Sequence, residues 1–302
     1  MALVAVGVHW LWAPLLPVDA PQTSRTAPVR IASLTLATDE ILSELVPTKR
    51  IVCVTNLVDD PEISNVANFY PDQIPRLRDA DLERIMAIEP DLVCVASYNS
   101  ADFLKIMDRA GISLYRNEAY HTLDEIEAGI VALGKCVGEP ERAQGVAGRM
   151  RSRRAQLADR LRGLSHRHRV LFWSAGFTSG QGTTLDDIIR EAGAINVAAE
   201  NGMKGSQEIS PERIIASDPD FIVLANWTAD DRHADIKNHP LLRNLRAVSA
   251  NKTIVIDARY LLCVSQYVVE GAERLARALH PDRFRDAPTS SAKGEKALRV
   301  SP

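Results

Sequence analysis

The chain has 302 residues, of which 46% are apolar and 25% are charged, and its formal net charge is −3. This balance is typical of a globular protein with a sizeable core, and the length allows two domains of about 110 to 150 residues. Because the net charge is small and Lys and Arg are dispersed except around Arg149 to Arg169, there is no general attraction to polyanions, and nucleic acid is excluded as an expected partner.

The first twenty residues form an apolar run that ends at Ala20 in a small-residue pattern typical of signal-peptidase cleavage. The usual basic segment before such a run is absent, and Pro14 and Pro17 break the helix early. The run is too short and too broken for a membrane span, whereas a frayed N-terminal arm remains an alternative. We expect an exported, periplasmic protein without a lipid anchor, in which residues 1–27 are a signal or a flexible N-terminus.

Short β-branched runs then alternate with amphipathic helical stretches along most of the chain. This alternation predicts an α/β fold with mainly parallel sheets covered by helices. One long stretch with few breakers, from Glu139 to Leu164, interrupts the alternation and predicts a single long helix. The predicted strands are residues 30–34, 50–55, 92–96 and 112–115 before this helix, and 169–173, 221–225 and 253–257 after it.

The two halves share a repeated segment. Residues 81–96 and 210–225 have seven identities in sixteen aligned positions at an offset of 129, where chance gives about one. The period is far too long for a solenoid, so the repeat indicates a duplicated α/β unit. Each copy predicts a short helix, an acidic-Pro-Asp turn and a buried strand.

Two similar lobes joined by one long helix follow from the repeat and the helix together. Ligands of open α/β sheets bind at the carboxyl ends of the strands, so the expected site is a cleft between the lobes, and a helical connection predicts little closure. The predicted domains are an N-terminal lobe, a linker helix, a C-terminal lobe and a disordered tail at residues 28–138, 139–166, 167–285 and 286–302.

The four cysteines lack any metal-like spacing. Cys53 and Cys94 lie in apolar, strand-like runs, which favours buried free thiols. A disulfide between these two stays open, because sequence cannot fix the geometry that the bond requires.

The segments RIASLTLATDEILSELV, DLERIMAIEPDLV, SPERIIASDPDFIVL and VVEGAERLARALHP stand in a distinctive order around the predicted linker helix. In this order the chain resembles the helical-backbone (class III) substrate-binding proteins of ABC importers, which carry cobalamin, haem or ferric siderophores. The resemblance spans about Arg30 to Phe284. It implies a monomeric binding protein with no cofactor of its own, a small-molecule metal chelate of cobalt or iron as ligand, and an importer permease dimer as partner.

The resemblance also implies that one glutamate in each lobe pairs with arginines of the permease. The matching residues are Glu83 and Glu212, which are equivalent in the repeat. Two carboxylates on rigidly linked lobes suit a two-fold partner, one charge pair per half. The alternative is that each carboxylate only complements the dipole of its own helix.

Ligand contacts are expected in the loops that follow the strands, where the resemblance implies them. Aromatic rings there suit a flat macrocycle, although packing between the lobes is an equally good explanation for any one ring. The candidates are Thr35, Thr38, Asn56, Tyr70, Ser97, Tyr98 and Asn99 in the first lobe, and Trp173, Phe177, Lys204, Ser206, Asn226, Trp227, Arg259 and Tyr260 in the second.

These residue types leave three ligands open. A haem needs an axial ligand, for which the candidates are Tyr70, Tyr98, Tyr120 and Tyr260. An anionic siderophore needs cations, for which Arg259 and Lys204 are available. The neutral residues Asn56, Ser97, Asn99 and Asn226 favour a cobalamin-like corrinoid, although Gly205-Ser206 stands where an aromatic residue would strengthen that prediction.

The alternative function is a two-lobed α/β enzyme, such as a metal chelatase or a nucleotide-sugar transferase. A transferase needs a phosphate-binding glycine loop, and a chelatase needs a histidine beside its metal. The strand ends carry neither motif, and the chain has no Walker A sequence or G-x-S-x-G elbow. His166 and His168 are predicted to be solvated surface residues. We therefore expect no catalytic residues and no resident metal.

Overall fold

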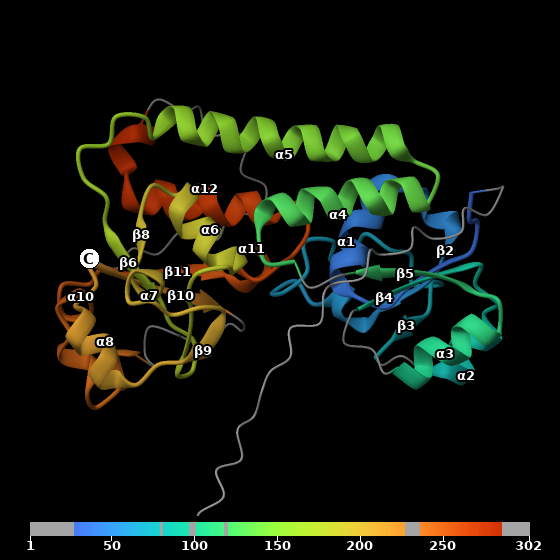
Figure 1. Cartoon of the computed structure of the whole chain (residues 1–302), viewed down its shortest axis with the longest axis horizontal. Helices are drawn as coiled ribbons and strands as arrows, with labels where there is room; N and C mark the ends of the chain where they lie inside the picture. Colours follow the sequence, from blue (N-terminus) through green and yellow to red (C-terminus); the bar gives the residue numbers. More distant parts are fainter. Residues whose placement is uncertain (1–26, 79–80, 97–100, 118–119, 227–235, 286–302) are drawn as a thin grey trace, which may run out of the picture.

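The computed structural model describes residues 27–78, 81–96, 101–117, 120–226 and 236–285. It consists of two α/β lobes bridged by one long helix (Figure 1). The predicted fold class is confirmed.

The N-terminal lobe is built on a five-stranded sheet of order β3-β2-β1-β4-β5, in which every pair of neighbours is parallel. Its elements are β1 (Ile31–Ser33), α1 (Leu36–Leu45), η1 (Thr48–Arg50), β2 (Ile51–Thr55), η2 (Asn56–Asp59), β3 (Arg76–Leu77), α2 (Leu82–Ala87), β4 (Leu92–Ala96), α3 (Ala101–Arg109), β5 (Ser113–Asn117) and α4 (Leu123–Cys136).

The C-terminal lobe has a four-stranded parallel sheet of order β11-β10-β6-β8 and a separate antiparallel pair, β7-β9. Its elements are β6 (Arg169–Phe172), β7 (Phe177–Ser179), α6 (Thr184–Glu191), β8 (Ile195–Asn196), α7 (Val197–Glu200), β9 (Ser206–Glu208), α8 (Pro211–Ser217), β10 (Phe221–Asn226), η3 (Leu242–Asn244), α10 (Arg246–Ser249), β11 (Thr253–Asp257), α11 (Ala258–Leu261), α12 (Val268–Leu279) and η4 (Pro281–Phe284).

All seven predicted strands are present, with ends that differ by a residue or two. Sequence reasoning missed β3, β7, β8 and β9, which have only two or three residues each. A strand this short contains no alternation that a period-two pattern could reveal.

The repeat has the same local structure in both lobes. Helix α2 begins with the Asp81 carboxylate accepting a hydrogen bond from the Arg84 amide, and α8 begins with the Ser210 hydroxyl accepting from the Arg213 amide. After each helix the backbone turns through a left-handed residue, Glu89 with φ 45° or Asp218 with φ 39°. The predicted order of helix, acidic-Pro-Asp turn and buried strand is confirmed.

An arginine and an aspartate tie each turn to the first strand of its lobe. Arg30 donates to the carbonyl oxygens of Ile88 and Glu89. Arg169 donates to the equivalent carbonyl oxygens of Ser217 and Asp218. In turn Asp91 accepts the Arg30 amide at 2.9 Å, and Asp220 accepts the Arg169 amide at 2.9 Å. The duplication therefore extends to residues that the sequence alignment did not pair.

Cys53 and Cys94 are buried free thiols. They lie on β2 and β4, which flank β1 on opposite sides, paired with Ala32 and Ser33 of that strand. Two strand spacings separate them by roughly 10 Å, which is too far for a disulfide. Burial raises the pKa of Cys53 to about 12, so this thiol is inert at neutral pH.

Helix α5 (Pro140–Arg160) lies along both lobes, with Pro140 at its first turn and a buried face of small and apolar residues. Among the described residues no helix is both long and apolar enough to cross a membrane. Arg154 of α5 bonds Asp124 at the start of α4 and Glu191 at the end of α6, so one side chain joins the two lobes.

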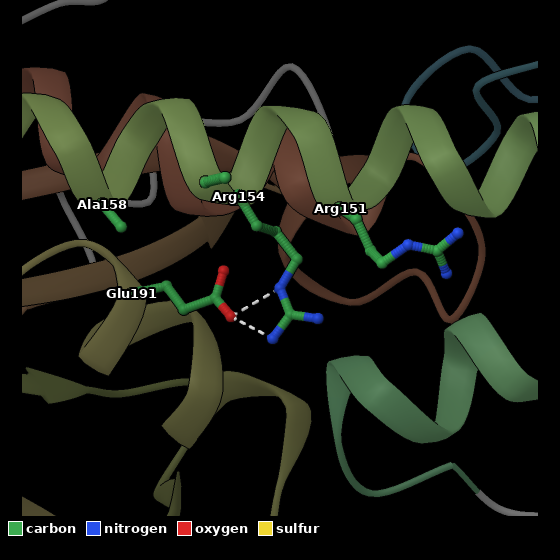
Figure 2. Close-up of a pocket in the computed structure, with 5 residues that line it drawn as sticks. Arg151, Arg154, Ala158 and Glu191 are labelled. Carbon is green, nitrogen blue, oxygen red and sulfur yellow. Dashed lines mark hydrogen bonds and ion pairs between the residues drawn. The ribbon is translucent and has the colours of Figure 1, made fainter.

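A cavity of about 310 Å³ lies beside this junction, lined by Arg151, Arg154, Ala155, Ala158 and Glu191 (Figure 2). Both guanidinium groups already have carboxylate partners, since Arg151 pairs with Glu127. We therefore assign the cavity to the bracing of the lobes and not to ligand binding.

Close packing of α5 on α4 depends on Gly134, where an added Cβ would lie 2.1 Å from the Ala143 Cβ. We expect Gly134→Ala to lower the free energy of unfolding by about 1–3 kcal/mol through overpacking. The matched control is Gly145→Ala on the exposed face of α5, where the nearest atom is the end of the Arg149 side chain at 3.9 Å. That change should raise stability by about 1 kcal/mol. Urea denaturation of both variants measures the difference, and equal effects would contradict it.

Candidate functional site

The lobes meet along a polar seam beside the carboxyl ends of the strands. Asn65, which follows η2, donates to the backbone oxygen of Arg259 at 2.7 Å. Gln266, which precedes α12, donates to the backbone oxygen of Glu40 at 2.9 Å. Both bonds cross from one lobe to the other, so the strand ends of the two sheets are brought to a common region, as the sequence predicts.

Glu40 is the centre of this seam. Its side chain is fully buried, and it accepts the Asn65 amide at 2.8 Å, the Asn65 side-chain amide at 2.9 Å and the hydroxyl of Ser265. Burial raises its pKa, while these donors oppose the shift. Both carboxylate oxygens accept hydrogen bonds within the protein and the side chain has no exposed surface, so we assign Glu40 to joining the lobes and not to ligand binding.

The neighbouring Asp39 heads an internal network of hydroxyl groups. It accepts the amide and the hydroxyl of Thr55 through one carboxyl oxygen, at 3.2 and 2.6 Å. The hydroxyl of Thr38 lies 2.7 Å from that of Ser33 and 2.8 Å from that of Thr35. Thr38 has no exposed surface and Thr35 only 8%, so the expectation that they contact a ligand is corrected: they fix the turn between β1 and α1.

Tyr70 is also removed from the candidates. Its side chain is 3% exposed and its hydroxyl donates to the backbone oxygen of Asp39 at 2.5 Å. Burial raises its pKa well above the usual value, so a phenolate for iron coordination is not accessible at this position.

The second lobe offers aromatic surface at the end of β6. Trp173 is half-buried and meets the ring of His239 edge-on at 6.3 Å, whereas Phe177 on β7 is 48% exposed. Ser206 on β9 is exposed, and its hydroxyl lies 3.0 Å from that of Ser179. Lys204 precedes β9 and is exposed. The β7-β9 pair and the residues just before it thus hold three of the predicted ligand contacts, Phe177, Lys204 and Ser206.

Arg259 and Tyr260 follow β11 and are partly engaged. The Arg259 guanidinium lies 4.8 Å above the Tyr260 ring and pairs with Asp257 at 3.4 Å. Arg274 lies 4.3 Å from the same ring, so Tyr260 is held between two cations. The Nε atom of Arg259 is buried and has no hydrogen-bond partner among the described residues, which leaves one donor available.

The remaining candidates divide into two groups. Asn56 and Asn226 stand at the ends of β2 and β10 and are half-buried. Ser97, Tyr98, Asn99 and Trp227 lie outside the described residues.

One strand-end residue was missed: Asn117, at the end of β5, is 6% exposed, and its side-chain oxygen is buried without a partner in the described part of the chain.

Glu83 and Glu212 are both exposed at the second position of their helices, α2 and α8. The helices lie in different lobes, on the side of the molecule away from α5 (Figure 1). Hydrogen bonding at the start of α8 lowers the pKa of Glu212, which keeps it ionised. The two carboxylates are available to a partner.

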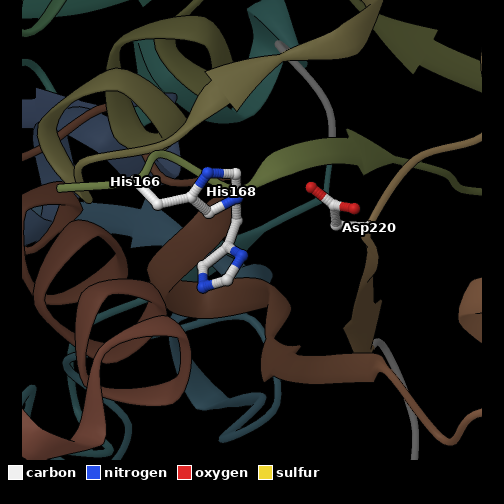
Figure 3. Close-up of side chains that lie close together, drawn as sticks. All are labelled: His166, His168 and Asp220. Carbon is white, nitrogen blue, oxygen red and sulfur yellow. The ribbon is translucent and has the colours of Figure 1, made fainter.

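His166, His168 and Asp220 form a cluster away from the seam, with potential ligand atoms within 4.8 Å of one another (Figure 3). His166 is exposed as predicted, but His168 is half-buried and stacks on His280 at 5.6 Å. Both oxygens of Asp220 already accept hydrogen bonds, one from the Arg169 amide and one from Arg246 at 3.1 Å. Asp220 therefore has the same structural task as Asp91, and we assign no metal here.

The model of the periplasmic binding protein family matches residues 31–260. The chain belongs to this family. Its members are extracytoplasmic binding proteins, so this is a binding protein and not an enzyme, as the sequence predicts, and the chelatase or transferase alternative has no support.

The known relatives have different ligands in their names. A cobalamin-binding protein of Halobacterium salinarum is 25% identical over 281 residues, which cover 87% of this chain and 74% of the relative. The molybdate-binding protein MolA of Haemophilus influenzae is 25% identical over 258 residues, 75% of this chain and 70% of the relative. The apo structure of the heme-binding protein RhuT from Roseiflexus sp. RS-1 has a TM-score of 0.73 at 23% identity and covers 84% and 98% of the two chains. That likeness supports the two-lobed fold.

Sequence reasoning missed the acidic pair in the middle of the seam. A partial signal was present: Asp39 and Glu40 stand between Ala37 and the apolar pair Ile41-Leu42 in the helix LATDEILSEL. Leu36 lies four residues before Glu40 and so on the same face of this helix, which favours a buried position for that acid.

The buried Asp39 predicts a pH dependence of stability. Burial raises its pKa from 3.8 to about 8, so between these values the native chain keeps a proton that the unfolded chain releases. This contribution is complete below pH 4 and is lost as pH rises to 8, because the native state binds more protons in that window. We expect Asp39→Asn to flatten the decline in unfolding free energy between pH 4 and 8 by ~2 kcal/mol or more. Urea denaturation at several pH values measures this, with the exposed Asp72→Asn as control. An unchanged slope in Asp39→Asn would contradict the assignment.

Proposed function

We propose that this protein is exported to the periplasm, captures a metal chelate between its lobes and delivers it to an ABC importer permease. A cobalamin-like corrinoid is the favoured ligand, ahead of haem and ferric siderophores. The observation that carries the proposal is the set of side chains at the strand ends: an exposed and a half-buried aromatic ring, Phe177 and Trp173, together with the neutral amides Asn56 and Asn226.

Charge at the strand ends favours a neutral ligand. The Arg259 guanidinium is paired with Asp257 and packed on the Tyr260 ring, with only its buried Nε donor left over, and Lys204 is the other cation among the described candidates. A strongly anionic siderophore or an oxyanion needs several Lys or Arg side chains that are not already paired with carboxylates. A corrinoid presents amide groups and a flat face, which amides and aromatic rings complement.

Haem is less well served by the same residues. Of the tyrosines considered as axial ligands, Tyr70 is buried with its hydroxyl bonded and Tyr260 is enclosed by Arg259 and Arg274. The cobalamin-binding relative supports the same choice of ligand, because its similarity extends over 87% of this chain.

Delivery is proposed to use Glu83 and Glu212. Their exposure, their equivalent positions in the repeat and the bracing of the lobes by α5 suit a partner made of two like halves. We propose that the protein acts as a monomer, since the two lobes already provide the two-fold pair.

Titration of the purified protein with cyanocobalamin, haemin and a ferric hydroxamate siderophore tests the ligand. We expect saturable quenching of tryptophan fluorescence by cyanocobalamin and weaker responses to the others. Trp173→Leu should weaken cobalamin binding by about tenfold, equivalent to about 1.4 kcal/mol of lost stacking. Phe284→Leu, at the outer end of the C-terminal lobe, is the control and should bind normally. A response to haemin alone would reject the corrinoid.

Uptake of labelled cobalamin by cells tests the docking residues. We expect the double variant Glu83→Ala/Glu212→Ala to bind cobalamin with unchanged affinity and to lose uptake, because both charge pairs with the permease are removed. The double variant Glu125→Ala/Glu141→Ala changes two other exposed glutamates and should transport normally. Normal uptake by the Glu83/Glu212 variant would reject the docking role.

A further inference from the structure

The repeated helices α2 and α8 expose an apolar side chain at the same position. Met86 is 40% exposed on α2 and Ile215 is 44% exposed on α8. They are equivalent in the repeat, since both follow the identical Glu-Arg-Ile triplet. The pattern of burial is also the same from Leu82 to Ala87 as from Pro211 to Ala216, with one fully buried isoleucine in each helix.

Each apolar residue lies one helical turn after a proposed docking carboxylate. Residues three apart on a helix stand on the same face, so Met86 is beside Glu83 and Ile215 is beside Glu212. The buried residues Ile85 and Ile214 anchor each helix to its lobe, with 0% exposure. The apolar side chains are therefore additional to the core and are held at its surface.

Exposure at one such position would be unremarkable, because single surface hydrophobics are common. Exposure at both equivalent positions is informative, since the lobes have otherwise diverged to only seven identities in the sixteen residues of the repeat. An apolar side chain beside an exposed charge is the arrangement of an interface in which the charge steers and the apolar contact supplies affinity.

We infer that Met86 and Ile215 are the apolar anchors of the permease interface, each filling an apolar recess beside the arginine that receives the neighbouring glutamate. This inference rests on the proposed docking through Glu83 and Glu212 and adds a second, uncharged component to it. The occupant of both surfaces is one partner with two equivalent subunits, because the two anchors repeat the internal symmetry of this chain.

The two components differ in their kinetics. Long-range attraction between charges acts on the association rate and is screened by salt. Short-range apolar burial is made only after docking, so its loss raises the dissociation rate. The double variant Met86→Ser/Ile215→Ser should therefore dissociate at least tenfold faster at an unchanged association rate.

The experiment measures binding of the cobalamin-loaded, full-length protein to the importer permease in nanodiscs by surface plasmon resonance at several salt concentrations. Met86→Ser/Ile215→Ser is compared with Glu83→Ala/Glu212→Ala, with the conservative Met86→Leu/Ile215→Leu, and with Val29→Ser, an apolar residue that is 61% exposed before β1. Cobalamin affinity and melting temperature of each variant report on folding. The conservative variant and Val29→Ser should bind as the unchanged protein does.

Faster dissociation of the serine variant, with an unchanged salt dependence and recovery in the leucine variant, supports the inference. Unchanged dissociation of the serine variant, while the glutamate variant associates more slowly, overturns the inference and leaves the proposed docking intact. Unchanged binding by both double variants overturns the inference and the docking together. Equal weakening by Val29→Ser would also overturn it, since the effect would not belong to the repeated helices.

Discussion

The fixed relation between the two lobes is the constraint on which the rest of the structure depends. Two sets of contacts provide it. Arg154 of the linker helix joins Asp124 of one lobe to Glu191 of the other, and Glu40 is shared between Asn65 of its own lobe and Ser265 of the second. Helix α5 runs along both lobes and packs against them through its buried face. Such a frame keeps two surface helices at a constant separation, which a partner with two equivalent sites requires.

The seam has an energetic cost that its hydrogen bonds offset. A buried carboxylate without donors would be strongly destabilising, but Glu40 accepts three hydrogen bonds. Asp39 is less well satisfied, because one of its oxygens lacks a partner among the described residues, and burial raises its pKa to about 8. Two adjacent acids thus have different tasks: Glu40 links the lobes, whereas Asp39 binds Thr55 inside one lobe.

The duplication also separates what the lobes share from what distinguishes them. They share the cap, the turn, the arginine that braces the turn and the exposed residues of α2 and α8. They differ at the strand ends, where the second lobe has the β7-β9 arm and the first has the internal hydroxyl network. In the proposed function the shared helices serve the partner, and the strand ends, where the lobes differ, define the ligand.

The sequence by itself determined the α/β class, the duplication, the long strands, the linker helix and the equivalence of Glu83 and Glu212. These features are local: hydrophobic periodicity, helix-start residues and a sixteen-residue repeat contain their own evidence. Only the tertiary structure decided which polar residues remain accessible. Thr38 and Tyr70 carry groups that suit a ligand, yet both are turned inward and bonded to neighbours in their own lobe. Glu40 looked like an ordinary helical acid, and its role as the link between lobes depends on Ser265, which is 225 residues away in the chain. Burial and pairing across such distances are properties of packing, and no local pattern contains them.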